Sequence, residues 1–220
     1  MAAVLSTQGP VSGVRRRTPA QARSREKVEK ILDAATQVVV AEGVDSLTTR
    51  AIAARAGIPV ASLYQYFSDR DAVLLALVER DTAEMDEQVR VDLAQLDVLS
   101  VTTLVETTMR AYLTVYDRRR DFVEIWLRGR TNPAVHEFGR QHNRRTAAEL
   151  REFAIAAGLA RPDLPLAAAE LAVEIGDRVF QLAFERDPAG DAFVIEEGIA
   201  MVAGYLRGFA TEAGVAGIRA

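Results

Sequence analysis

A short segment around Leu63 carries side chains whose chemistry suits the recognition of DNA bases. Leu63 and Phe67 are one helical turn apart and would anchor a short helix to a core. Ser62, Gln65 and Tyr66 would then point away from that core and present a hydroxyl, an amide and a phenol. Such groups bond to base edges in the major groove, where Gln65 could pair with an adenine. The segment therefore predicts an exposed reading helix.

The residues before this segment predict a second helix and a fixed turn. Thr48 can cap a helix that starts after it. Ala53 offers a small side chain where two helices cross, and Gly57 follows where the chain must turn at positive φ. Pro59 stands near the start of the reading helix, where its missing N–H costs nothing. Together the two short helices predict a helix-turn-helix whose second helix fits the major groove.

Hydrophobic periodicity predicts an all-α chain of about nine helices, without strand alternation. Ser68 is expected to cap the fourth helix, with Asp71 in the glutamate position of a capping box. Asn132 and Pro133 are expected to open the seventh. The expected helices cover residues 19–42, 47–56, 60–67, 69–93, 99–118, 121–130, 132–157, 166–186 and 191–213.

Three parts are expected along the chain. Residues 1–20 are interpreted as a disordered basic arm that carries Arg15-Arg16-Arg17, either reaching DNA or forming a solvated tail. Residues 21–68 form a three-helix DNA-binding domain, and residues 69–220 form a larger helical body.

Charge is unevenly distributed although the net charge is −4. Residues 1–80 hold eleven basic and eight acidic side chains, whereas the remaining residues hold sixteen and twenty-three. A basic domain on an acidic body fits contact with phosphates, because that attraction comes from local Lys and Arg. A solvated charged face remains the alternative.

Several other classes of protein have little support. The absence of cysteine removes disulfides, thiol catalysis and cysteine metal sites. No phosphate-cradling glycine loop or hydrolase motif occurs, and His136 and His142 are a poor metal pair at a spacing of six. No apolar run is long enough to span a membrane, and no secretory signal is evident. These absences disfavour an enzyme, and no cofactor or metal is expected. We expect the protein to be cytoplasmic.

The segment from residue 23 to residue 75 resembles the N-terminal domain of tetracycline-repressor-type (TetR) regulators. Many positions agree at fixed spacing, which makes the resemblance specific. Two features depart from the usual pattern: Pro59-Val60-Ala61 replaces a more polar or basic stretch, and Arg70 replaces a lysine. The matching residues are Gly43, Leu47, Thr48, Arg50, Ile52, Ala53, Ala56, Gly57, Leu63, Tyr64, Tyr66, Phe67 and either Leu74 or Leu75.

The resemblance implies roles for individual residues in DNA binding. Arg50 corresponds to a base-reading arginine that can grip a guanine. Base or sugar contacts are implied for Val60, Ala61, Ser62 and Gln65, and phosphate contacts for Thr48, Thr49, Tyr64, Tyr66 and Arg70. Partial packing in the core is the alternative for Tyr64.

The resemblance also implies a ligand pocket in the body and a homodimer through the last two long helices. Plain core packing is the alternative for the pocket residues, and completion of a monomer core is the alternative for the two helices. Glu174, Asp177 and Arg178 interrupt an apolar helix and either orient a ligand or lie on a wet face. The expected pocket residues are Met109, Tyr112, Tyr116, Trp126, Phe138, Asp177, Phe180 and Phe184.

The implied function is a sequence-specific repressor that leaves a pseudo-palindromic operator in double-stranded DNA when an unknown small-molecule effector binds. A repressor without a small-molecule effector and, more remotely, an all-α enzyme are the alternatives. A well-formed apolar cavity in the body would favour the effector-controlled repressor over one without an effector.

Overall fold

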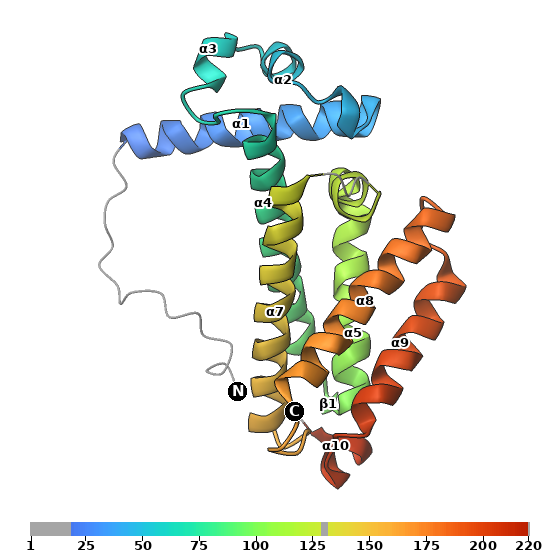
Figure 1. Ribbon diagram of the computed structural model, residues 1–220. Coiled ribbons are helices and arrows are strands. Elements are labelled where there is room, and N and C mark those ends of the chain that lie inside the picture. The colour runs from blue at the N-terminus through green and yellow to red at the C-terminus, as the bar shows by residue number, and fades with distance from the viewer. Residues whose placement is uncertain (1–18, 129–131, 220) are drawn as a thin grey trace.

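The computed structural model describes residues 19–128 and 132–219 of the 220-residue chain. The predicted basic arm with Arg15-Arg16-Arg17 lies almost entirely outside the described residues, which begin at Pro19. The fold is all-α, as predicted, with a small group of helices lying across one end of a larger helical body (Figure 1).

The small group is the head of the molecule. Helix α1 (Pro19–Glu42) lies across the end of the body, and η1 (Val44–Ser46), α2 (Thr49–Ala56) and α3 (Val60–Leu63) pack on its outer side (Figure 1). Gly43 directly follows α1 with a φ of 82°, a backbone conformation that glycine adopts without strain.

The body is a bundle of long helices with short pieces at its ends. Two two-residue strands pair antiparallel, with Val98 opposite Arg219 and Leu99 opposite Ile218. The elements in chain order are α4 (Arg70–Leu93), β1 (Val98–Leu99), α5 (Val101–Arg118), α6 (Arg120–Phe122), η2 (Val123–Arg128), α7 (Pro133–Ala156), α8 (Leu166–Arg186), α9 (Ala192–Arg207), α10 (Glu212–Ala216) and β2 (Ile218–Arg219).

Helix α4 belongs to both parts of the molecule. Its first half buries Leu74 and Leu77 near the head, and its second half buries Met85 and Val89 in the body. The residue that caps it is Asp69, whose Oδ1 accepts a hydrogen bond of 2.8 Å from the amide of Ala72. The expectation that Ser68 caps this helix is therefore wrong, because a carboxylate one residue later occupies the capping position.

Three other features of the body differ from the sequence prediction. The last long helix ends at Arg207 rather than near residue 213, and the chain starts a separate short helix, α10, after Thr211. The segment expected as one helix from 121 to 130 divides into α6 and η2, a π-helical turn. Strands β1 and β2 were not expected, since two residues are too short to show an alternating pattern.

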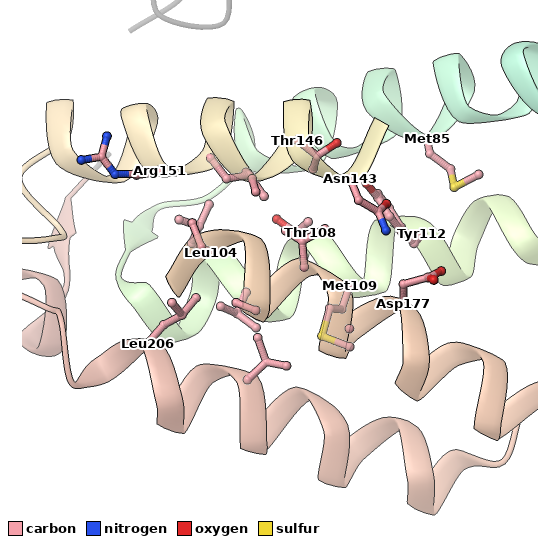
Figure 2. Close-up of a pocket in the computed structure, with 18 of the residues that line it drawn as sticks. Met85, Leu104, Thr108, Met109, Tyr112, Asn143, Thr146, Arg151, Asp177 and Leu206 are labelled. Atoms are coloured by element: carbon pink, nitrogen blue, oxygen red, sulfur yellow. The ribbon is translucent and has the colours of Figure 1, made fainter. Parts of the chain in front are cut away.

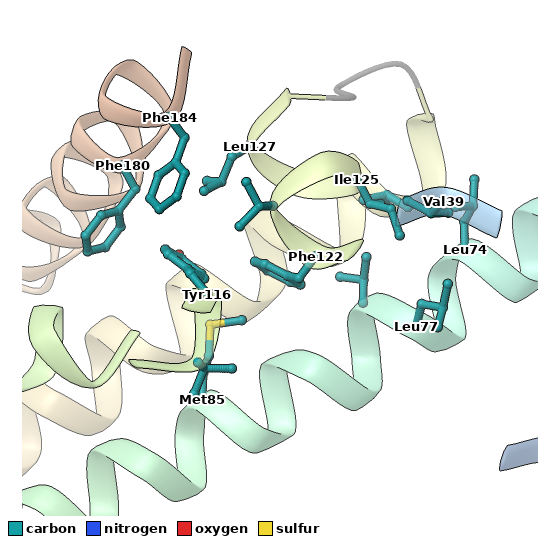
Figure 3. Packing of buried hydrophobic residues seen from close by; sticks show 14 of the residues in the cluster. Val39, Leu74, Leu77, Met85, Tyr116, Phe122, Ile125, Leu127, Phe180 and Phe184 are labelled. Atoms are coloured by element: carbon teal, nitrogen blue, oxygen red, sulfur yellow. The ribbon is translucent and has the colours of Figure 1, made fainter. Parts of the chain in front are cut away.

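Aromatic and aliphatic side chains join the head to the body through a continuous core. Figure 3 shows Val39 of α1 near Leu74 and Ile125, with Phe122, Tyr116 and Phe180 continuing into the body. Phe122 stacks on Tyr116 with ring centroids 5.6 Å apart, and Tyr116 meets Phe180 edge to face at 5.3 Å. A packed core of this kind transmits displacement, because it has little free volume.

Gly198 holds α8 and α9 close together within the protomer. A Cβ atom on Gly198 would lie only 2.3 Å from Cγ1 of Val179 on α8. Gly204, two turns later on α9, is exposed, and a Cβ there would have no neighbour closer than 3.7 Å. The two glycines therefore have different structural roles although they share one helix.

Substitution of each glycine by alanine should separate these roles. Gly198→Ala is expected to lower the free energy of unfolding by about 1–3 kcal/mol, because the new methyl group overpacks the α8–α9 contact. Gly204→Ala causes no such clash within the protomer, so it should lower the free energy of unfolding less than Gly198→Ala does. Urea unfolding at one protein concentration measures both, and equal effects of the two substitutions would contradict the assignment.

Candidate nucleic-acid interface and ligand cavity

Local interactions fix the angle between α2 and α3. Thr48 caps α2, its Oγ1 accepting from the amide of Ala51 at 3.1 Å, as expected. Gly57 adopts the left-handed conformation, with a φ of 63°, and turns the chain toward α3. The hydroxyls of Thr49 and Tyr64 lie 3.2 Å apart and connect the two helices on their outer side. The turn is thus held by a cap, a glycine and a cross-helix hydrogen bond.

Half of the residues expected to contact DNA are exposed on the head. Arg50, Ala61 and Gln65 are exposed, and Tyr64 is 53% exposed rather than packed in the core. Arg50 makes no ion pair with any residue that the structure describes. Its guanidinium is therefore available to a partner.

Five of the expected contact residues are half-buried: Thr49, Val60, Ser62, Tyr66 and Arg70. Val60 and Tyr66 pack against the core, so the expectation that Tyr66 points away is wrong. The reason is the shortness of α3, which ends at Leu63 and leaves Tyr66 in a turn beside Leu63. Arg70 stands at the start of α4, with Nε 3.5 Å from Oδ1 of Asp71.

The body contains an apolar cavity of about 120 Å³. Helices α4, α5, α7, α8 and α9 form its walls, and Figure 2 shows lining residues from several of them turned toward one another. A single enclosed water needs roughly 10–15 Å³, so this space admits a small molecule. The wall contributed by α4 consists of Thr82 and Met85.

Six of the eight expected pocket residues lie against this cavity: Met109, Tyr112, Tyr116, Trp126, Asp177 and Phe180. Phe138 and Phe184 do not. Phe138 stacks instead on His142, with ring centroids 6.1 Å apart. Phe184 is buried one turn beyond Phe180 and packs edge to face on Tyr116, past the end of the cavity.

Sequence reasoning did not select several polar residues that line the cavity. Thr108 lies one helical turn from both Leu104 and Tyr112, so its place on the inner stripe of α5 was readable from the spacing. His142, Thr146 and Arg151 come from α7, whose inward face mixes polar and small residues and gave no comparable signal. The Thr108 hydroxyl is buried and has no hydrogen-bond partner among the described residues.

The polar groups near one end of the cavity are mutually satisfied. Asp177 accepts hydrogen bonds from Nε1 of Trp126 at 2.9 Å and from Nε2 of Gln181 at 2.6 Å. Burial, reinforced by the Arg145 cation, lowers the pKa of His142 to about 4, so this imidazole is neutral at pH 7. Its Nδ1 must accept from Arg145 at 2.9 Å, because a guanidinium only donates.

A buried charge network lies where the head meets the body. Oδ2 of Asp121 accepts from Oγ1 of Thr36 on α1 at 2.6 Å and lies 3.5 Å from Nη2 of Arg80. Nε of Arg80 donates to Oδ1 of Asp81 at 3.0 Å, and Arg119 lies 3.6 Å from the same oxygen. Burial, followed by the charge of Asp121, raises the pKa of Asp81 to about 6.

Two family models match the chain in the order that the fold suggests. Bacterial regulatory proteins of the tetR family match residues 31–77, and the tetracyclin repressor-like C-terminal domain matches residues 101–206. The chain belongs to the TetR family. The first model covers the helix-turn-helix, and the second covers most of the cavity, so this TetR-family chain is a transcriptional regulator with a DNA-binding head.

Individual proteins that resemble this chain also include TetR-family and helix-turn-helix regulators. A helix-turn-helix-type transcriptional regulator encoded in the dhlA 5′ region of Xanthobacter autotrophicus is 25% identical over 134 residues, which are 59% of this chain and just under two thirds (66%) of that protein. A TetR-family regulator from Streptomyces coelicolor has a TM-score of 0.67 and 29% identity, covering 82% of this chain and 97% of its own. SmeT, the repressor of a multidrug efflux pump in Stenotrophomonas maltophilia, shares the fold with a TM-score of 0.61 at 24% identity, over 85% and 92% of the two chains.

The described part of this TetR-family chain holds neither a membrane-spanning helix nor a cluster of metal-binding side chains. No helix within it is both long and apolar enough to cross a membrane. Nor do its His, Asp and Glu residues gather in a group of three that would hold a metal ion.

The buried network predicts a pH-dependent effect of Asp81→Asn. Because the folded pKa of Asp81, about 6, exceeds its unfolded value of about 3.9, protonation stabilises the folded state below the unfolded pKa, and this stability is lost as the pH rises toward 6. Asparagine carries no such dependence. The unfolding free energy of the variant, relative to wild type, should therefore rise by up to about 3 kcal/mol between pH 4 and pH 7. Denaturant unfolding across this range measures the difference, and a constant or falling difference contradicts the assignment.

Proposed function

We propose that this TetR-family regulator represses transcription as a homodimer on a pseudo-palindromic operator and leaves the operator when a small molecule fills the cavity. The observation that carries the proposal is that α4 lines the cavity with Thr82 and Met85 and, in the same helix, supports the head through Leu74 and Leu77. A ligand that moves the cavity wall therefore acts on the element that positions the reading helix.

The release step follows from differential affinity. A ligand shifts the position of the heads only if it binds the cavity more tightly in the released conformation than in the DNA-bound one. Trp126 contributes to this coupling, since it lines the cavity and belongs to η2, which contacts α1. Displacement at the cavity then reaches the head by two routes, one through α4 and one through η2.

Exposed apolar side chains on α8 and α9 support the homodimer. Leu171 on α8 is 48% exposed, and on α9 Phe193 is 72% and Met201 55% exposed. Phe193, Met201 and Tyr205 lie at spacings of eight and four on α9, so they share one side of the helix. An apolar side of this kind matches a self-complementary interface between two copies, which would place two heads about one helical turn of DNA apart.

Met201→Asp should break this interface. The new carboxylate would lose its water on dimerisation, so the variant is expected to become monomeric and to lose operator affinity. Val215→Asp is the matched control, because Val215 is 59% exposed but lies on α10. Sedimentation at micromolar concentration reports the mass of each variant. A dimeric Met201→Asp protein would refute the proposed interface.

The head is proposed to divide its contacts between bases and backbone. Arg50, Gln65 and the α3 residues Val60, Ala61 and Ser62 face base edges or sugars, and Arg50 grips a guanine. Thr48, Thr49, Tyr64, Tyr66 and Arg70 contact phosphates and fix the register. Val60 and Tyr66 are half-buried, so only part of each side chain is free to contact DNA.

Two arginine substitutions test this division. Arg50→Ala should relax base preference at one position of each half-site by about 1–3 kcal/mol. Arg70→Ala should weaken binding to all sequences about equally and reduce the salt dependence of binding. Binding to a randomised DNA pool, sequenced before and after selection, distinguishes the two outcomes. The division would be wrong if both variants lost affinity without a change in sequence preference.

Gly176 offers a way to fill the cavity by mutation. It lines the cavity, and a Cβ there would meet only Cε of Met109, at 4.0 Å. Gly176→Leu should keep operator binding and abolish release by ligands that stabilise the wild-type protein, whereas Gly176→Ala should keep both properties. Fluorescence anisotropy of labelled operator measures release, and ligand-driven release from Gly176→Leu protein contradicts the proposed role of the cavity.

A repressor without a small-molecule effector remains the second candidate. It predicts that ligands of the cavity leave operator affinity unchanged even when they bind. The unpaired hydroxyl of Thr108 weighs against it, because a buried hydroxyl without a partner is costly unless a bound molecule satisfies it.

A further inference from the structure

The cavity is long and narrow. Its lining residues on α7 run from His142 to Ala154, which at 1.5 Å per residue is about 18 Å along the helix axis. A cavity of about 120 Å³ that extends over this length has a small cross-section and forms a thin channel. Such a channel suits a single flexible chain better than a fused ring system.

One end of this channel carries a positive charge. Arg151 lines the cavity near the turn that leads to α8, and Figure 2 shows it at one end of the labelled residues, with Asp177 and Met85 toward the other. Nε of Arg151 donates to the backbone oxygen of Leu164 at 2.7 Å. Its two terminal nitrogens have no hydrogen bond and no carboxylate partner among the described residues.

The surroundings of Arg151 leave this charge unneutralised. The nearest acidic neighbour in the α7–α8 turn, Asp163, pairs with Arg161 at 3.3 Å. Glu152 follows Arg151 directly but is exposed, outside the cavity lining. Arg151 is half-buried, and the hydrogen bond to Leu164 orients its guanidinium before any ligand arrives.

We propose that the cavity binds an anionic, chain-like amphiphile, with its carboxylate or similar head on Arg151 and its alkyl chain running toward Trp126. Arg151 sets this direction, because it is the one cationic side chain among the described residues that line the cavity. The middle of the channel adds the unpaired hydroxyl of Thr108, which a hydroxyl or carbonyl group along the chain would satisfy.

The inference rests on the proposed function only in treating this cavity as the ligand site. Direct binding to the purified protein without DNA therefore tests it separately. Isothermal titration calorimetry with decanoate, 1-decanol and decylamine compares three head groups on one chain length. Trp126 is the only tryptophan in the chain and lines the cavity, so its fluorescence reports whether a ligand enters there.

Wild-type protein should bind decanoate at least about tenfold more tightly than decanol or decylamine, as expected for one charge-assisted contact. Arg151→Gln keeps a donor for the Leu164 oxygen but removes the charge, and it should abolish the preference for decanoate while leaving decanol binding within about threefold. Arg151→Lys should restore part of the preference. Arg144→Met is the matched control, an exposed cation on the same helix outside the cavity lining, and should behave as wild type.

Three results would overturn the proposal: no binding of any of these chains, equal binding of decanoate and decylamine by the wild type, or an unchanged preference in Arg151→Gln protein whose melting temperature matches wild type. If decanoate binds through Arg151 without releasing DNA, this inference stands and ligand-controlled release is contradicted instead.

Discussion

The structure depends on the continuity of α4. Its 24 residues form one uninterrupted helix of about 36 Å, packed on the head at one end and on the cavity at the other. Sharp kinks in helices form at proline, glycine or a bulge, and α4 contains neither proline nor glycine. Motion of its cavity half must therefore move the head as a rigid extension, or break the contacts that α4 makes with α1.

The contacts between α4 and α1 combine two kinds of interaction. Leu74 and Leu77 give an apolar seam, which tolerates sliding because dispersion and the hydrophobic effect are non-directional. Arg80 of α4 adds directional contacts to α1, because its Nη2 donates to Oγ1 of Thr36 at 3.1 Å and its Nη1 lies 3.4 Å from Oδ1 of Asp33. A displacement of α4 relative to α1 must therefore break these polar contacts as well as slide the apolar seam.

Much of this architecture was predictable because helices carry local signals. Apolar periodicity, the Thr48 cap and the Gly57 turn are encoded within a few residues, and they were confirmed. The π-helical turn at Val123–Arg128 and the end of α9 at Arg207 were not predictable, since both depend on packing against distant elements. For the cavity, inward-facing aromatic residues could be selected by type, but type alone could not separate Phe180, which lines the space, from Phe184 one turn away. The sequence could not show that Arg151 lacks a carboxylate partner among the described residues, because this depends on Asp163 pairing with Arg161.

The central claim is that a sequence-reading head is carried by this helical body. The most direct measurement is selection of genomic DNA fragments by the purified full-length protein at about 150 mM salt, where non-specific binding is weak. The account predicts one or a few enriched sites, each with two half-sites related by a pseudo-two-fold axis and centred about one helical turn apart. A folded protein that enriches no fragment would contradict the account, and would indicate that Pro59-Val60-Ala61 has removed the reading function of α3.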